Sequence, residues 1–130
     1  RGRKGMGKPG NTGIKRIILA THCSAQGLYY AWRHESAFRQ EIALIVILLP
    51  LAIWLGDNYL EKLMLVLSLL LVLIVELLNS AVEATVDRIS DEQHKLAGGA
   101  KDMGAAAVFL SLVVVVSVWS TIAYKNIFLG

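Results

Sequence analysis

The chain has 130 residues, of which 55% are hydrophobic, and its mean hydropathy is +0.56. Soluble domains are usually about 45–50% apolar, so the composition argues against an ordinary soluble domain and favours a membrane protein. The formal net charge is +3, and the single cysteine, Cys23, excludes an intramolecular disulfide.

The beginning of the chain is basic and rich in glycine. No acidic residue precedes Glu35. Residues 1–13 are expected to form a disordered basic tail, and residues 14–130 a single membrane domain. A basic segment can bind nucleic acid, but with membrane spans attached to it the expected partner is the anionic lipid surface.

Residues 14–33 are predicted to form an amphipathic helix. Apolar residues recur at helical spacing from Ile14 to Trp32, and Lys15, His22 and Arg33 fall on the opposite face. This pattern is typical of a helix that lies in the membrane interface.

Three long runs carry no charged residue, namely 42–56, 63–75 and 103–124. A bilayer core of about 30 Å is crossed by about 20 apolar residues in a helix. We therefore expect an all-α membrane protein with transmembrane helices over about 36–55, 59–89 and 102–125, in addition to the surface helix.

Capping signals set the expected ends of these helices. Asn58 and Glu61 have the spacing of a capping box for the second span. Ser90 and Gln93 repeat this spacing in the following connection. Gly98 and Gly99 then predict a helix stop. Asp102 is expected to be the N-cap of the third span.

Basic residues are unevenly distributed between the connections. Seven Lys or Arg precede Glu35, and the connection over 87–102 holds three more, whereas the turn over 56–62 holds one lysine. By the positive-inside rule the N-terminus is expected in the cytoplasm and the C-terminus outside.

A polar stripe interrupts the second span in the sequence VELLNSAVEATVDRI, residues 75–89. Asn79, Ser80, Glu83 and Asp87 all lie within about 60° of Glu76 on a helix. An ionisable side chain inside a bilayer costs roughly 2.5–3.5 kcal/mol, so these groups are expected to serve a purpose.

Two neighbouring segments are expected to add to this stripe. Glu35 and Arg39 share one face at i,i+4 before the first span, while Lys101 and Asp102 are expected at a helix N-terminus suited to phosphate. Such carboxylates, with phosphate oxygens, could hold Mg²⁺. The alternative is that the polar groups only join helices to one another; the number of groups on one stripe favours a site.

The segments ESAFRQE, VELLNSAVEATVDRI and AKDMGAAAV, in this order over three spans, resemble the bacterial integral-membrane diacylglycerol kinase family. The resemblance covers about residues 13–125. It implies a homotrimer in the bacterial inner membrane whose subunits share active sites. The implied reaction transfers the γ-phosphate of ATP to the hydroxyl of diacylglycerol and yields phosphatidic acid.

The resemblance also implies roles for individual residues. Glu76 would be the general base, Glu35 and Glu83 would hold Mg²⁺, and Asp87 would only support the site. The residues implied to bind ATP are Arg16, Glu35, Asn79, Glu83, Glu92, His94, Lys101 and Asp102. Those implied to contact the lipid are Trp32, Ala37, Phe38, Arg39, Gln40, Glu41 and Trp119.

The sequence leaves alternatives open. The chain departs from the family pattern at His22, Cys23, Ala25, Tyr30 and Ala105, so an undecaprenol kinase of the same fold is one alternative. A small oligomeric transporter, in which Glu76 binds a cation or a proton, is an alternative from another class. A structural membrane subunit is the third.

Overall fold

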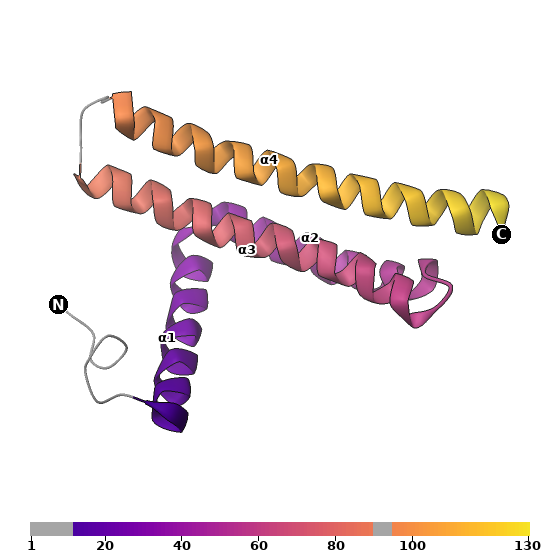
Figure 1. The fold of residues 1–130 in the computed structure, drawn as a ribbon, viewed down its shortest axis with the longest axis horizontal. Helices are drawn as coiled ribbons and strands as arrows, with labels where there is room; N and C mark the ends of the chain where they lie inside the picture. Colours follow the sequence, from indigo (N-terminus) through magenta and orange to yellow (C-terminus); the bar gives the residue numbers. More distant parts are fainter. Residues whose placement is uncertain (1–11, 90–94) are drawn as a thin grey trace. The chain divides into compact units, whose positions relative to one another are not determined.

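The computed structural model describes residues 12–89 and 95–130, and every element in these ranges is a helix (Figure 1). The chain divides into two compact units, Arg1–Ser36 and Ala37–Gly130. The expected basic tail lies almost wholly outside the described residues.

The first unit contains one helix, α1 (Gly13–His34). Its first residue, Gly13, has a φ of 58°, a left-handed conformation that glycine adopts without steric cost. The apolar residues of the predicted stripe are exposed, with Ile14, Ile17 and Ile18 between 62% and 76% accessible. An exposed apolar face along a helix agrees with the predicted amphipathic surface helix.

The other helices are α2 (Ser36–Leu55), α3 (Tyr59–Ile89) and α4 (Lys95–Ala123), which continues as the π-helix η1 (Tyr124–Leu129). Their lengths and hydropathies are sufficient for three membrane spans among the described residues. The bounds of α2 and α3 coincide with those of the first two predicted spans. The chain is therefore an all-helical, multi-pass membrane protein.

The start of α4 differs from the prediction. The helix begins at Lys95 and runs without interruption through Gly98, Gly99 and Asp102. Neither glycine has the positive φ of a helix stop, and Asp102 is an internal residue, not an N-cap. Glycine costs only about 1 kcal/mol in a helix, which packing against another helix can outweigh. The predicted capping pair Ser90 and Gln93 lies outside the described residues.

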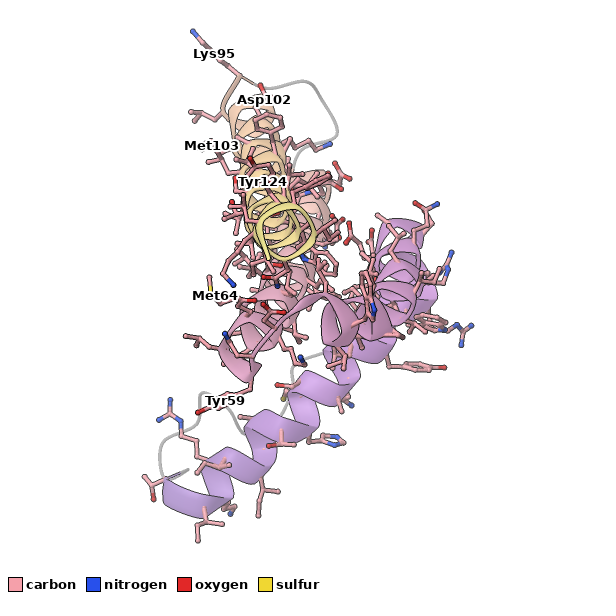
Figure 2. All side chains as sticks on the ribbon, turned by 90° about the vertical axis from the view of Figure 1, so that its right-hand side faces the viewer. Tyr59, Met64, Lys95, Asp102, Met103 and Tyr124 are labelled. Carbon is pink, nitrogen blue, oxygen red and sulfur yellow. The ribbon has the colours of Figure 1, made fainter. Side chains whose placement is uncertain are left out.

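Helices α3 and α4 lie side by side along their length (Figure 1). At the end that carries the α2–α3 turn, α2 joins them in a core formed by Ala52, Leu55, Leu65 and Ile122. Figure 2 looks along the helices from this end, and shows Lys95 projecting away from the pair. The core thus holds the three helices together at one end.

Polar side chains close this same end, and we call Asp57, Asn58, Glu61, Lys125 and Asn126 the turn-end cluster. Asn58 Oδ1 accepts a hydrogen bond from the Glu61 N–H (2.9 Å), and Glu61 Oε1 accepts one from the Asp57 N–H (3.0 Å). The predicted capping by Asn58 is confirmed, although Glu61 reaches the residue before the cap.

The end of α4 is tied to this turn. Lys125 Nζ lies 3.0 Å from Glu61 Oε2, and Asn126 Nδ2 donates to both Glu61 Oε1 (2.9 Å) and the Leu55 carbonyl (2.8 Å). One asparagine therefore bridges the end of α2 and the beginning of α3.

Large apolar side chains cover much of the outside of α2, α3 and α4. Exposed apolar patches of this extent are unusual on soluble monomers. Bilayer lipid and neighbouring subunits are the surroundings that such surfaces fit. Examples from the three helices are Leu44, Ile47, Trp54, Leu67, Leu78, Phe109, Leu110 and Val116.

Candidate active site

The buried residues of α3 form a continuous seam. Leu65, Leu69, Val72 and Glu76 are 0–8% exposed and follow one another at intervals of three or four residues. The next member at this spacing is Asn79, whose Oδ1 is buried. The seam is thus apolar near the turn-end cluster and polar toward the other end of α3.

The seam faces α4. The indole N–H of Trp119 donates to the Ser68 hydroxyl (3.0 Å), which itself donates to the Leu65 carbonyl (2.7 Å). Farther along, the Asn79 side chain lies directly against Gly104. The polar part of the stripe therefore lies in the interface between two transmembrane helices.

Three pairs of residues fix the register of the two helices: Ser68 with Trp119, Asn79 with Gly104, and Asp87 with Lys101. The α4 number rises as the α3 number falls, so the helices are antiparallel. Glu76 lies between the first two pairs, at the level of about Val108 to Ser111. Ser111 is itself buried, with its hydroxyl bonded to the Val108 carbonyl.

The stripe changes from buried to exposed along α3. Glu76 is 8% exposed, Asn79 is half-buried, and Glu83 is exposed. Glu76 and Glu83 are separated by about 10 Å along the axis at 1.5 Å per residue. Asn79 Nδ2 faces Glu83 Oε2 across 3.4 Å. Asn79 thus lies along α3 between the buried carboxylate of Glu76 and the exposed carboxylate of Glu83.

Asn79 also carries an unsatisfied group. Its Oδ1 has no hydrogen-bond partner among the residues that the structure describes. Leaving a buried acceptor unpaired costs about 1–3 kcal/mol, so such atoms are rare and often mark a functional site.

Lys101 and Asp102 lie on α4 near the exposed part of the stripe. Lys101 Nζ forms an ion pair with Asp87 Oδ1 at 2.7 Å, and both side chains are largely exposed. The two residues are the seventh and eighth of α4, counted from Lys95. The expectation that they offer free N–H groups at a helix N-terminus is wrong, because only the first four N–H groups are free there. Their side chains can still contact phosphate.

Several predicted lipid contacts begin α2. Phe38 is buried at 3% exposure, Arg39 and Glu41 are half-buried, and Ala37 and Gln40 are exposed. The arrangement shows a mixed polar and apolar surface at the start of this span. Their contact with lipid stays a prediction.

Trp119 does not lie beside Glu76. Its hydrogen bond to Ser68 places it eight residues away along α3, about 12 Å at 1.5 Å per residue. Its ring also packs on the core of Ala52, Leu55, Leu65 and Ile122. Trp119 therefore takes part in helix packing, and its contact with lipid stays a prediction.

The remaining predicted residues belong to other parts of the chain. Arg16, Trp32 and Glu35 belong to the first unit; Arg16 is in the first turn of α1, and Glu35 is its C-cap, with its N–H bonded to the Ala31 carbonyl (2.8 Å). Glu92 and His94 lie outside the described residues.

The cluster that the structure does assemble comprises Glu76, Asn79, Glu83, Asp87, Gly104 and Lys101. Of these, Gly104 had not been predicted. A glycine inside a helical pattern costs about 1 kcal/mol relative to alanine, and this local signal is present in the sequence AKDMG. Among the described residues, no group of three or more His, Cys, Asp or Glu side chains could hold a metal ion alone.

Comparisons with known proteins identify relatives of this chain. The family model described as "Prokaryotic diacylglycerol kinase" matches residues 22–123. The diacylglycerol kinase of Pseudomonas aeruginosa is 51% identical over 113 residues, which cover 87% of this chain and 92% of that protein. Those of Haemophilus influenzae and Escherichia coli K12 are 48% and 45% identical, covering 87% and 88% of this chain and 96% and 94% of theirs.

Proposed function

The chain belongs to the prokaryotic diacylglycerol kinase family, and we propose that it transfers the γ-phosphate of ATP to the free hydroxyl of diacylglycerol, giving phosphatidic acid and ADP. The observation that carries this proposal is the polar seam of α3. A buried carboxylate, an unsatisfied amide and an exposed carboxylate follow one another along α3.

Glu76 is the proposed general base. The residue is 8% exposed within a helix long and apolar enough to span a membrane, and we place it at the level of the lipid hydroxyl. The carboxylate accepts the hydroxyl proton as the hydroxyl oxygen bonds to the γ-phosphorus. The bond from that phosphorus to the β,γ-bridging oxygen breaks, and ADP leaves. A positioned base typically contributes about 10²–10⁴-fold to the rate.

Lys101 is proposed to bind the phosphates of ATP. Its ammonium group is exposed, beside Asp87 and within electrostatic range of Glu83. A triphosphate can compete with the single carboxylate of Asp87 for this cation, because it carries more negative charge. Asp102, on the next position of α4, and Arg16, Glu92 and His94 remain the further residues expected from the family resemblance to line the nucleotide site.

The phosphoryl transfer needs a divalent metal, and the residues present fit Mg²⁺. Glu83 offers carboxylate oxygen atoms, the ligands that Mg²⁺ prefers. Because the described residues hold no complete metal cluster, most ligands would be phosphate oxygens and water, as is usual for Mg²⁺. Bound there, the ion would neutralise charge on the transferring phosphoryl group. Glu35 is retained as the second protein ligand expected from the sequence.

We further propose a homotrimer in the bacterial inner membrane, with the N-terminus in the cytoplasm. The distribution of Lys and Arg supports this orientation. The exposed apolar faces of three helices support contacts with lipid and with further subunits. The lipid-contact role of Trp32, of residues 37–41 and of Trp119 is part of this proposal.

The deciding experiment offers diacylglycerol and undecaprenol in parallel, with labelled ATP and Mg²⁺, in lipid micelles. Labelled phosphatidic acid is the expected product. Labelled undecaprenyl phosphate as the only product would support phosphoryl transfer from ATP, with undecaprenol as the substrate in place of diacylglycerol. No transfer to either lipid, from a folded oligomer, would refute the kinase; proton flux coupled to a solute would then favour a transporter.

A further inference from the structure

We propose that Gly104 is a positioning residue for this phosphoryl transfer, and that its missing side chain sets the orientation of Asn79. The expected effect on catalysis rests on the proposed function. The contact between Asn79 and Gly104 is observed between α3 and α4 and does not depend on that function.

The space beside Gly104 is already occupied. A Cβ placed on Gly104 would overlap Oδ1 of Asn79 and would lie 3.3 Å from its Cγ. The amide of Asn79 therefore fills the volume that the first side-chain carbon of any other residue would need. Gly104 allows this close approach because it has no Cβ.

This approach fixes both ends of the amide. With Oδ1 held against Gly104, Nδ2 points along α3 toward Glu83 Oε2, 3.4 Å away. Oδ1 itself is buried and has no hydrogen-bond partner in the described part of the chain. If Asn79 rotated to avoid a Cβ, it would carry Nδ2 away from Glu83 and remove a restraint on that carboxylate.

A substitution at Gly104 can change the orientation of Asn79 without lowering the stability of the fold. The atom that a new Cβ would meet is the end of a flexible side chain, whereas no backbone atom of α3 is in the way. The protein can therefore accommodate alanine at residue 104 by turning Asn79, and alanine is the better helix former. Gly104→Ala should lower activity without lowering stability.

The same helix provides matched controls. Gly98 and Gly99 also lie inside α4, and a Cβ at either position meets nothing within 4 Å. Gly98→Ala and Gly99→Ala make the same change in helix propensity without touching Asn79. Both should retain the kinetics of the parent protein.

The test measures steady-state kinetics and thermal unfolding of the full chain in lipid micelles. Gly104→Ala should lower kcat and raise KM for MgATP, so that kcat/KM falls about 100-fold, the size of effect expected from a 1 Å misplacement. KM for diacylglycerol should not change, and the unfolding midpoint should not fall. Parental kinetics in Gly104→Ala would overturn the inference, as would an equal loss in the Gly98→Ala control.

A double variant tests whether Gly104 acts through Asn79. In an Asn79→Ala background, adding Gly104→Ala should change little, because residues in contact couple non-additively. The same fold-loss in both backgrounds would contradict the proposal. If Gly104→Ala alone fails to fold, the double variant should restore folding, because alanine at residue 79 leaves room for the Cβ at residue 104. A double variant that is equally unfolded would refute the proposed contact between Asn79 and Gly104.

Failure of the inference can be distinguished from failure of the proposed function. A parent protein inactive on diacylglycerol would refute the function, whereas an active parent with a normal Gly104→Ala variant would refute only the inference. MgATP binding gives a readout that needs no lipid. MgATP should raise the unfolding midpoint of the parent more than that of Gly104→Ala, and equal shifts would count against the proposal.

Discussion

The two ends of the α3–α4 pair both carry polar side chains, but they use them differently. In the turn-end cluster, the carboxylate of Glu61 accepts hydrogen bonds from a backbone N–H, from Asn126 and from Lys125. At the other end, Asn79 leaves one buried oxygen unpaired among the described residues and makes one long contact to Glu83. The first arrangement satisfies its polar groups within the fold, and the second leaves capacity for a ligand.

This difference indicates which end contributes to stability and which to function. Satisfied hydrogen bonds contribute about 0.5–1.5 kcal/mol each to folding, whereas an unpaired buried acceptor costs about 1–3 kcal/mol. Substitutions at the turn-end cluster should therefore affect unfolding, and substitutions in the polar seam should affect turnover. Variants with both effects would weaken the comparison.

The largest effect is expected for Glu76→Gln. Removing the proposed base should lower turnover at least about 100-fold, with the fold intact, because glutamine has nearly the same shape. Glu61→Gln, the same change in the turn-end cluster, is the control and should retain parental turnover. Measured kcat values near the parent for Glu76→Gln would rule out its catalytic role.

The next effect is expected for Asn126→Ala at the opposite end. The variant loses two hydrogen bonds, to the Leu55 carbonyl and to Glu61. The free energy of unfolding should fall by about 2 kcal/mol, while turnover below the unfolding temperature stays unchanged. Denaturant unfolding in micelles measures the loss, and Ser120→Ala, an exposed change on α4, provides the baseline. A drop in kcat without loss of stability would contradict our assignment of the turn-end cluster to stability.

Glu83→Gln should have a smaller effect that is specific to the metal. The Mg²⁺ concentration that gives half-maximal activity at fixed ATP should rise about tenfold or more, a usual result of weakening a metal site. Titrating Mg²⁺ at several ATP concentrations measures it. An unchanged Mg²⁺ requirement would remove Glu83 from the proposed metal site.

The smallest effect is expected for Ser68→Ala, beside the apolar part of the seam. It removes the acceptor of the Trp119 indole N–H and should lower the free energy of unfolding by about 1 kcal/mol. Thermal unfolding measures the change, with turnover as the control quantity. If kcat falls as well, the apolar and polar parts of the seam are not separable.

Local patterns in the sequence were sufficient for much of this fold. The uncharged runs and the cap residue Asn58 predicted α2 and α3, since span length and capping depend only on nearby residues. The helical spacing of Glu76, Asn79 and Glu83 likewise predicted the polar stripe. Each of these features needs one helix and no knowledge of its neighbours.

Features that depend on packing between helices were not predictable in this way. Gly98, Gly99 and Asp102 have the local signals of a helix boundary, yet α4 continues through them beside α3. The contact of Asn79 with Gly104 depends on the antiparallel register of residues 25 positions apart. The hydrogen bond of Trp119 to Ser68 depends on the same packing of α4 against α3.

The hydrogen bond of Trp119 also makes the seam observable by spectroscopy. The chain has three tryptophans; Trp32 and Trp54 are 46% and 71% exposed, whereas Trp119 is half-buried with its N–H bonded to Ser68. Replacing the two exposed rings by phenylalanine would leave one intrinsic fluorophore between α3 and α4. Its emission wavelength and quenching by lipid-soluble agents would then report the separation of these helices while the enzyme turns over.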